Sequence, residues 1–360
     1  MRVVNLGMVS VPRSLAVFHA VAHMAGPADE MTLVFATPQS PFVSVGYHQL
    51  ASRELNVAYC QAHDIPIARR LVGGGAVLLD QNQVFWHLIM PGAHAAVKDL
   101  YAALLPAPVA AYQRMGIRAS IRPLNDIVVG DQKIGGTGAA TIGQSLLFVG
   151  SLMYDFDREL MAQVLRVPSE KFRDKTVQAL GAYMTTMAEQ LGGALPARDE
   201  AAQILSEEFA RMLDTPARHE SLREDEEEQV TRFERRLFDP AFVFQNEGWT
   251  VPGTKIAGGI YLYEGLFKSP TGLVRVIWRE REGLIENTWL GGDFLIEPAS
   301  ALQRVQDALN RQAVEPGELS QVLHRIFVEE QVKGISAEDV AQAFANRLSL
   351  DTLSVSGVEP

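Results

Sequence analysis

The sequence has a single cysteine, Cys60, which excludes an internal disulfide and any zinc site built mainly from cysteine ligands. It also lacks an apolar run of the roughly 18 residues that a membrane helix needs. We therefore expect no membrane-spanning segment and a reducing, cytoplasmic location. Basic residues are outnumbered, since 32 Lys and Arg stand against 43 Asp and Glu, for a formal net charge of −11. Sequence-independent nucleic-acid binding needs a basic face, so we expect no nucleic-acid partner.

The length and composition indicate two folded domains. The chain has 360 residues, of which 47% are hydrophobic and 21% charged, an ordinary globular balance. The segment 220–236 is densely charged, which favours a solvated helix face or a connector over an acidic partner-binding tail. We expect a first domain at residues 1–218, a charged connector at 219–245, a smaller domain at 246–345 and a tail at 346–360.

Hydrophobic periodicity predicts interleaved helices and strands, and hence an α+β (α/β) fold class. Helices are expected over 14–24, 52–63, 95–115 (broken or kinked at two prolines), 157–167 and 199–214. Strands are expected over 31–37, 42–47, 67–71, 76–79, 83–90, 127–129, 133–134 and 145–154. In the second domain we expect strands over 260–263, 273–279 and 284–290, followed by two amphipathic helices.

A glycine-rich segment follows two arginines. Arg69 and Arg70 are separated by two residues from Gly73, Gly74 and Gly75. Three glycines in a row provide positive φ angles, close backbone approach to a ligand, or amide groups that bind an anion. Arginines add charge that suits phosphate. The alternative is a flexible glycine hairpin with a surface arginine pair; the pattern is neither a Walker A loop nor a Rossmann fingerprint.

A second segment carries a lysine after a predicted tight turn. Asn125 and Asp126 precede a short strand, Gly130 and Asp131 form the expected hairpin tip, and Lys133 follows among small residues. An ammonium group in such a space can contact the attacking and leaving oxygens of a carboxylate–phosphate reaction, and the aspartate can hold Mg²⁺. The alternative is an ordinary turn with a solvent-facing lysine.

Together the two segments resemble the lipoate–protein ligase family, within the biotin/lipoate protein ligase superfamily. The resemblance covers residues 10–215 and is weaker over 240–335, where 283–294 looks like the family's accessory domain. It implies a mixed-sheet catalytic domain plus a small α+β accessory domain. The matching residues are Arg69, Arg70, Gly73, Gly74, Gly75, Ala76, Val77, Asp80, Asn125, Asp126, Lys133 and Gly136.

The resemblance implies an ATP-dependent ligase. Such an enzyme activates lipoate or octanoate as an acyl-AMP and transfers the acyl group to a lysine of a lipoyl carrier domain. Lys133 would be the catalytic cation, and Asp126 the candidate Mg²⁺ ligand. The residues implied at ATP or the adenylate are Arg70, Gly75, Ala76, Val77, Leu78, Asp126 and Lys133. Those implied at lipoate are Arg69, Gly73, Gly74, Val77 and Gly138.

Three positions depart from the family pattern. Leu79 stands where the family usually has histidine, Gly138 where it has alanine, and Thr137 where it has serine. The first two would alter the shape of the acyl pocket. The segment 171–187, which includes Tyr183 and Thr185, resembles the family's adenylate-covering loop.

Two rival functions remain open from the sequence. The first is an ATP-independent octanoyl or lipoyl transferase; octanoyl transferases of this superfamily use a cysteine nucleophile, and Cys60 does not match its position. The second is a non-catalytic lipoyl-binding module. His19 and His23 lie four residues apart, as metal ligands on a helix would, but a packed helix is the favoured interpretation.

Overall fold

The computed structural model describes residues 1–93, 97–166, 170–248, 255–257, 260–294, 296–298 and 300–347. The chain divides into two compact units. Two short segments of the N-terminal half belong to the unit that the C-terminal third forms. Unit 1 consists of Met1–Val45, Leu55–Val72 and Ala76–Val243, and unit 2 of Gly46–Glu54, Gly73–Gly75 and Phe244–Pro360.

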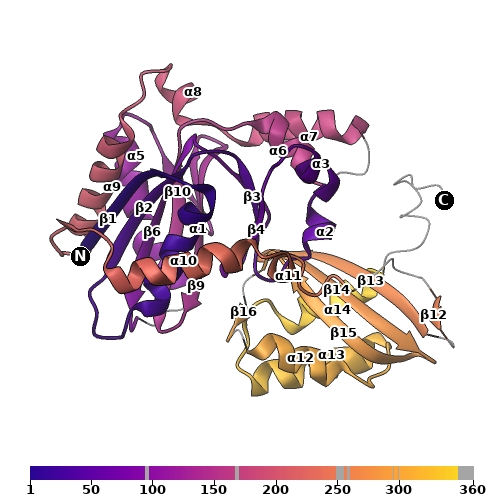
Figure 1. The fold of residues 1–360 in the computed structure, drawn as a ribbon. Helices are drawn as coiled ribbons and strands as arrows, with labels where there is room; N and C mark the ends of the chain where they lie inside the picture. The colour runs from indigo at the N-terminus through magenta and orange to yellow at the C-terminus, as the bar shows by residue number, and fades with distance from the viewer. Residues whose placement is uncertain are drawn as a thin grey trace. The chain divides into compact units, whose positions relative to one another are not determined.

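An eight-stranded mixed sheet forms the centre of unit 1, in the order β11-β1-β2-β6-β10-β9-β8-β7 (Figure 1). β1 pairs in parallel with β2 and β11, and the other neighbours are antiparallel. The expected mixed-sheet α/β fold class is therefore confirmed. The strands are β1 (Arg2–Val9), β2 (Thr32–Pro38), β6 (Gln83–Pro91), β7 (Ser120–Arg122), β8 (Asp126–Val129), β9 (Gln132–Ile142), β10 (Ser145–Met153) and β11 (Arg218–His219).

Helices cover both faces of this sheet (Figure 1). On β6, His87 stacks on Phe18 of α1 with ring centroids 3.9 Å apart, while the preceding Trp86 packs against Phe209 of α9 at 5.6 Å. Successive strand residues point to opposite faces, so α1 and α9 lie on opposite sides and β6 is buried on both. The helices of unit 1 are α1 (Val11–Met24), α3 (Val57–Ala62), α4 (Val97–Leu104), α5 (Pro106–Arg114), α6 (Arg158–Val164), α7 (Glu170–Tyr183), α8 (Met187–Leu191), α9 (Arg198–Met212), α10 (Glu224–Phe238) and α11 (Pro240–Val243).

A small three-stranded sheet adjoins the first segment of interest. Its order is β4-β3-β5, with β3 parallel to β4 and antiparallel to β5. β4 ends at Arg69, immediately before the second arginine, and β5 begins at Val77, immediately after the glycines and Ala76. The strands are β3 (Phe42–Val45), β4 (Ile67–Arg69) and β5 (Val77–Leu79).

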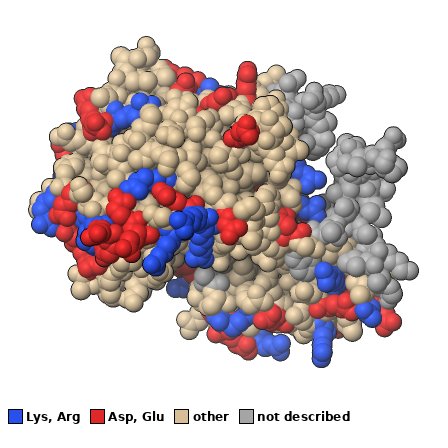
Figure 2. Space-filling view, viewed as in Figure 1, with Lys and Arg blue, Asp and Glu red and all other residues tan. Residues whose placement is uncertain are grey.

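The charged segment, for which we expected a solvated helix face or a connector, forms α10, one side of which is packed into unit 1. Val230, Phe233 and Leu237 recur at helical spacing and are buried in the same core cluster as α1. The opposite side of the helix is solvated, and Figure 2 shows acidic and basic side chains side by side on the surface that it forms. The compact unit accordingly ends after Val243.

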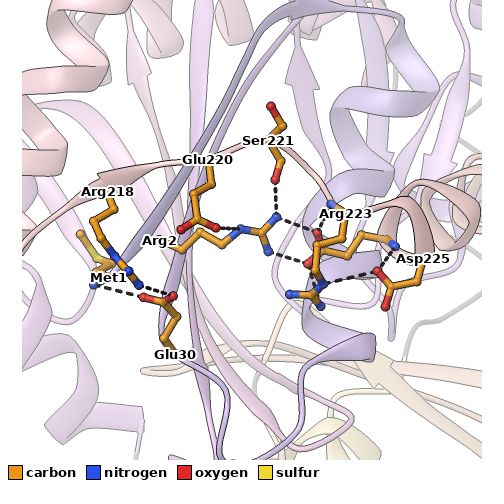
Figure 3. Close-up of polar contacts among 9 residues, drawn as sticks. Met1, Arg2, Glu30, Arg218, Glu220, Ser221, Arg223 and Asp225 are labelled. Atoms are coloured by element: carbon orange, nitrogen blue, oxygen red, sulfur yellow. Dashed lines mark hydrogen bonds and ion pairs between the residues drawn. The ribbon is translucent and has the colours of Figure 1, made fainter.

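A buried ion network fastens the start of the chain to α10 (Figure 3). Arg2 is 3% exposed and donates to both carboxylate oxygens of Glu226 at 2.7 Å, and to the carbonyl of Ser221 at 2.7 Å. Nearby, Arg218 donates to Glu30 at 2.6 Å. The first contacts tie β1 to α10 and the last ties β11 to the segment before β2, although the paired residues are far apart in the sequence.

Unit 2 is built on a four-stranded antiparallel sheet. One core cluster lies between this sheet and helices, and a second joins Leu50 of the 46–54 segment to Leu262, Ile277 and Trp289 of the sheet. The three strands predicted for the second domain are confirmed, each longer than expected. The elements are α2 (Ala51–Glu54), β12 (Lys255–Ala257), β13 (Ile260–Ser269), β14 (Gly272–Arg281), β15 (Leu284–Gly292), β16 (Ile296–Glu297), α12 (Ala301–Leu309), α13 (Pro316–Glu329), β17 (Lys333–Gly334) and α14 (Ala337–Ala345).

One predicted helix is interrupted in the structure, so its prediction as a single helix was wrong. The expected helix 52–63 is divided into α2 and α3, because Leu55 leaves the helix to form a β-bridge with Leu165. Asn56 then starts α3 as a capping residue, accepting a hydrogen bond from the backbone of Tyr59 at 3.2 Å. Within the described ranges, no helix has the length and apolar character needed to cross a bilayer.

Candidate functional site

The hairpin expected around Lys133 is confirmed. β8 and β9 pair antiparallel, with Gly130 at the tip in a left-handed conformation (φ +59°). Lys133 Nζ lies 2.6 Å from Asp126 Oδ1. A Cβ on Gly136 would lie 2.8 Å from that ammonium nitrogen, so a side chain at this position would fill the space around it. The glycine therefore keeps room for the lysine head group, as the run of small residues predicted.

Asp126 is surrounded by cations. Its second oxygen accepts hydrogen bonds from Arg122 at 2.8 Å and from the Tyr183 hydroxyl at 3.2 Å. Burial alone would raise the pKa of Asp126, but the positive charges of Lys133 and Arg122 outweigh it and lower the pKa below its usual value. The carboxylate is ionised at neutral pH.

This arrangement does not present a Mg²⁺ donor set, because both oxygens of Asp126 already have partners. Nor do the described residues contain a group of three or more His, Cys, Asp or Glu that could hold a metal ion. Mg²⁺ in nucleotide enzymes is often bound through one carboxylate and the substrate's phosphates. Asp126 as a metal ligand stays a prediction.

Asn125 clamps the base of the hairpin. Its amide donates to the carbonyl of Thr137 at 2.5 Å, and its own carbonyl accepts from the backbone and hydroxyl of Thr137 at 3.0 and 2.9 Å. The threonine that replaces the family's serine therefore retains a working hydroxyl, which fixes β9 against the residue preceding Asp126.

The two arginines before the glycines have different surroundings. Arg69 is fully buried and donates to the carbonyls of Phe242 at 3.0 Å and Val243 at 2.6 Å. Arg70 donates to the carbonyl of Ser44 at 2.9 Å. Burial and the nearby charge of Arg69 lower the pKa of Arg70 to about 10, so it stays cationic at neutral pH. Arg69 holds α11, and its role in lipoate binding stays a prediction.

The glycine loop itself belongs to unit 2. A Cβ on Gly46 would lie 2.0 Å from the carbonyl oxygen of Gly74, which has φ +88°. The 46–49 turn is closed by the Gln49 side chain, which accepts from the Gly46 amide at 2.9 Å. A Cβ on Gly75 would lie 3.8 Å from Asp293. The glycines are thus held by residues from two distant parts of the chain.

An ion network anchors the 46–54 segment to the sheet of unit 2. Glu264, which is 1% exposed, pairs with Arg275 and lies 3.4 Å from Arg53. Arg275 also lies 3.3 Å from Glu54. Two arginines and two glutamates therefore join α2 to β13 and β14, and this fixes the turn that supports the glycine loop.

Gly138, one of the residues predicted for the acyl pocket, lies among apolar side chains of unit 1. Gly138 on β9 pairs with Val149 on β10, and a Cβ on Gly138 would lie 3.3 Å from Val149 Cγ2 and 3.5 Å from Val72 Cγ1. Val77 is partly buried on β5, and the next residue, Leu78, is 2% exposed. The alanine usual in the family would have to displace Val149 by a few tenths of an ångström, whereas Val72 would be at an ordinary contact distance.

His19 contributes a contact that the sequence did not predict. Its Nε2 lies 3.0 Å from the amide of Leu71, and its Nδ1 lies 2.7 Å from the carbonyl of Leu15. A carbonyl only accepts and an amide only donates, so Nδ1 carries the proton and the ring is neutral. Burial lowers the pKa of His19 to about 3. The histidine thus fixes the backbone two residues before the glycines, as part of a packed helix.

Stability should fall as the pH drops below about 6.5. Burial lowers the pKa of His87, like that of His19, to about 3. Between pH 6.5 and 3 the unfolded chain binds these protons and the folded chain does not, so each site removes about 1.4 kcal/mol per pH unit. Above pH 6.5 this contribution to stability is complete.

Urea unfolding at pH 7.5, 6 and 5 checks this expectation. His87→Phe keeps a ring to stack on Phe18 and removes one titrating group, so its stability should depend less steeply on pH than that of the unmodified protein. His63→Phe, at an exposed position, is the matched control for exchanging a histidine for a phenylalanine. Equal slopes for all three proteins would contradict the prediction.

The predicted site residues therefore form two groups, one in each compact unit. Lys133, Asp126, Arg70 and Gly138 lie in unit 1, whereas 73–75 lies in unit 2. The sequence missed Arg122, Tyr183 and His19 as partners of the predicted residues, and Asp293 beside Gly75.

The comparisons place this mixed sheet with its lysine-bearing hairpin among the lipoyl and octanoyl transfer enzymes. The model of the family described as "Lipoyl protein ligase A/B catalytic domain" matches residues 13–210, which is more than half of the chain. The chain therefore belongs to this family.

Characterised relatives include both activities of the family. The chain is 25% identical over 268 residues to lipoate–protein ligase 1 of Staphylococcus aureus, covering 74% of this chain and 77% of the relative. It is also 25% identical over 239 residues to the octanoyltransferase LipM of Kyrpidia tusciae, covering 59% and 86%.

Solved structures support the fold over both units. The lipoate complex of P. falciparum LipL1 matches with a TM-score of 0.70 at 14% identity, covering 96% of this chain and 97% of that one. A lipoate-protein ligase A bound with ATP matches at 0.59 and 22% identity, covering 68% and 98%. A Thermoplasma acidophilum bipartite ligase, described with its E2 lipoyl domain, matches at 0.62 and 24%, covering 71% and 98%.

Proposed function

We propose that this protein is an ATP-dependent lipoate–protein ligase. The observation that carries the proposal is the ammonium of Lys133, held near the tip of a tight hairpin in a space that Gly136 keeps open. A fixed cation in such a place suits a reaction in which negative charge develops on phosphate oxygens. Relatives of similar identity include ligases and an octanoyltransferase, so the distinction depends on the chemistry of this chain.

The proposed reaction has two steps. A carboxylate oxygen of lipoate or octanoate attacks the α-phosphorus of MgATP, and the bond to the bridging oxygen breaks to release pyrophosphate. The amine of a lysine on a lipoyl carrier domain then attacks the acyl carbon, AMP leaves, and the amine loses a proton. The protein forms no covalent bond, so positioning and charge neutralisation supply the rate, and positioning alone can be worth about 7–11 kcal/mol.

The chain's own residues have separate tasks in this scheme. The ammonium of Lys133 stabilises the reacting phosphate and acyl oxygens. Arg70 binds phosphate oxygens, and the backbone of residues 75–78 lies against the nucleotide. Gly138 and Val77 line the apolar pocket for the acyl chain, whose burial contributes about 0.8 kcal/mol per methylene. Gly73 and Gly74 complete the loop at the lipoate.

Cys60 argues against the transferase alternative. It is the only cysteine of the sequence, lies on α3 and is fully buried. Burial raises the pKa of its thiol, which disfavours the thiolate that a covalent acyl intermediate needs. A ligase that forms an adenylate needs no such nucleophile.

A reconstituted reaction tests the proposal. The protein is incubated with MgATP, lipoate or octanoate, and an apo lipoyl domain, and the domain is weighed by mass spectrometry. We expect an acyl mass shift that requires ATP, is matched by AMP release and persists in Cys60→Ser. Acylation from an octanoyl-carrier donor without ATP would show a transferase, and tight lipoate binding without AMP release would show a binding module.

Gly46→Ala should weaken ATP and lipoate binding by about tenfold or more, because the new Cβ would displace the carbonyl of Gly74. Calorimetric titration measures both affinities. The control is Gly248→Ala, where a Cβ would meet no atom within 4 Å. Unchanged affinities in a folded Gly46→Ala protein would contradict the role of the loop.

A further inference from the structure

In this structure the side chain of Lys133 is already paired with a carboxylate. Lys133 Nζ lies 2.6 Å from Asp126 Oδ1, and the two side chains are 25% and 16% exposed. An ammonium paired this closely with a carboxylate is largely neutralised. To stabilise phosphate oxygens it has to exchange the carboxylate for the nucleotide. That exchange takes one cation away from a partly buried carboxylate, which is unfavourable unless another cation compensates it.

A second cation already lies on the other oxygen of the same carboxylate. Arg122 donates to Asp126 Oδ2 at 2.8 Å, so the lysine and the arginine do not compete for one atom. If Lys133 moves away, Asp126 keeps a charge partner at an unchanged position. Arg122 also donates to the carbonyl of Asp131 at 3.1 Å, which fastens it to the tip of the hairpin.

Tyr183 holds Arg122 in this orientation. The guanidinium lies over the phenol ring, 4.9 Å from its centroid, and donates to the hydroxyl at 2.7 Å. The hydroxyl in turn donates to Asp126 Oδ2 at 3.2 Å. Tyr183 ends α7, and the following Thr185 donates its amide to the carbonyl of Lys133 at 2.9 Å. The end of α7 is thus attached to both the ion pair and the strand that carries the lysine.

We propose that Arg122 is a substitute counter-ion, which keeps Asp126 neutralised while Lys133 moves to the nucleotide phosphates, and that Tyr183 orients it. The proposal rests on the proposed function. Arg122 and Tyr183 are then positioning residues for Lys133, and neither needs to touch the substrate.

Variants at position 122 separate charge from shape. Arg122→Gln removes the counter-ion and should lower kcat/KM for ATP in lipoate-dependent ATP–pyrophosphate exchange by about tenfold. Arg122→Lys keeps a cation and should recover at least half of the lost activity, measured on a logarithmic scale. Tyr183→Phe keeps the ring but loses the hydroxyl, so its loss should be smaller, about threefold. The exposed Arg118→Gln is the matched control and should be unchanged.

A double-mutant cycle with Asp126→Asn tests which role Arg122 has. It distinguishes a counter-ion to Asp126 from a direct ligand of the phosphates, and both from a residue whose loss only damages the fold. Without charge at position 126 there is nothing for Arg122 to neutralise, so Arg122→Gln should change the rate less than twofold in that background. If Asp126→Asn is too slow to assay, the same cycle is measured in calorimetric ATP affinity.

Two results would overturn the proposal. One is an equal loss from Arg122→Gln with and without Asp126→Asn, and the other is no loss in the unmodified background. An unmodified protein that shows no exchange with lipoate or octanoate would instead count against the proposed function.

Discussion

Replacing Lys133 with alanine is expected to slow acyl-adenylate formation by at least about a hundredfold, because loss of one preorganised charge-stabilising donor typically costs two to three orders of magnitude. The ammonium sits beside the space that Gly136 leaves, and no side chain of the hairpin can replace it there. ATP–pyrophosphate exchange in the presence of lipoate measures this step without the carrier domain.

The fold of this variant should be intact. Asp126 keeps its 2.8 Å contact with Arg122 and the hydrogen bond from Tyr183, so the substitution does not leave a bare carboxylate. Thermal unfolding should therefore be close to that of the unmodified protein. Lys333→Ala, at an exposed position, is the control for loss of a lysine. A folded Lys133→Ala protein that exchanges pyrophosphate at a tenth of the normal rate or faster would refute the assigned role.

The hairpin that carries Lys133 could be predicted because everything that forms it is local. A glycine with positive φ sits between two short β-rich runs, and the small residues that follow leave space for the ammonium. Turn chemistry and alternation determine such a unit within about fifteen residues. The other strands that we predicted could also be recognised from local alternation and turn residues.

The partners of these residues could not be predicted, because they come from distant segments. Tyr183 lies 57 residues from the aspartate it contacts, and Gly46 packs against a glycine 28 residues further on. No spacing in a single sequence indicates such contacts. The division of the chain into units shows the same limit, since 46–54 and 73–75 join the C-terminal unit through tertiary contacts alone.

The charged helix α10 shows how one strong signal can hide another. The run of acidic residues at its start is typical of a solvated segment. Val230, Phe233 and Leu237 repeat at intervals of three and four, which is the pattern of a packed helix face. We interpreted this segment from its charges, as a solvated helix face or a connector. The spacing of its apolar residues would also have indicated that one face of the helix is packed.

Glu226→Gln is expected to lower the free energy of unfolding by about 3 kcal/mol, since removing the closest partner of a buried ion pair leaves Arg2 with the more exposed Glu220, 3.5 Å from its Nε. Glu226 is 1% exposed and binds Arg2 through both oxygens at 2.7 Å. Glutamine keeps the shape but not the charge, so the guanidinium of Arg2 would remain buried with weaker partners. Urea unfolding at neutral pH measures the difference.

The adjacent Glu227 provides a matched control on the same helix. It pairs with Arg13 at 2.6 Å, as close as the buried pair, but its side chain is 43% exposed and that of Arg13 26%. Exposed ion pairs contribute at most about 1 kcal/mol, so Glu227→Gln should cost little. The two pairs have similar distances and differ in burial, and Glu226 also accepts a hydrogen bond from the amide of Arg223 at 2.8 Å, so the difference between the variants measures burial together with this contact. Equal costs for the two substitutions would mean that Arg2 does not depend on Glu226 for compensation.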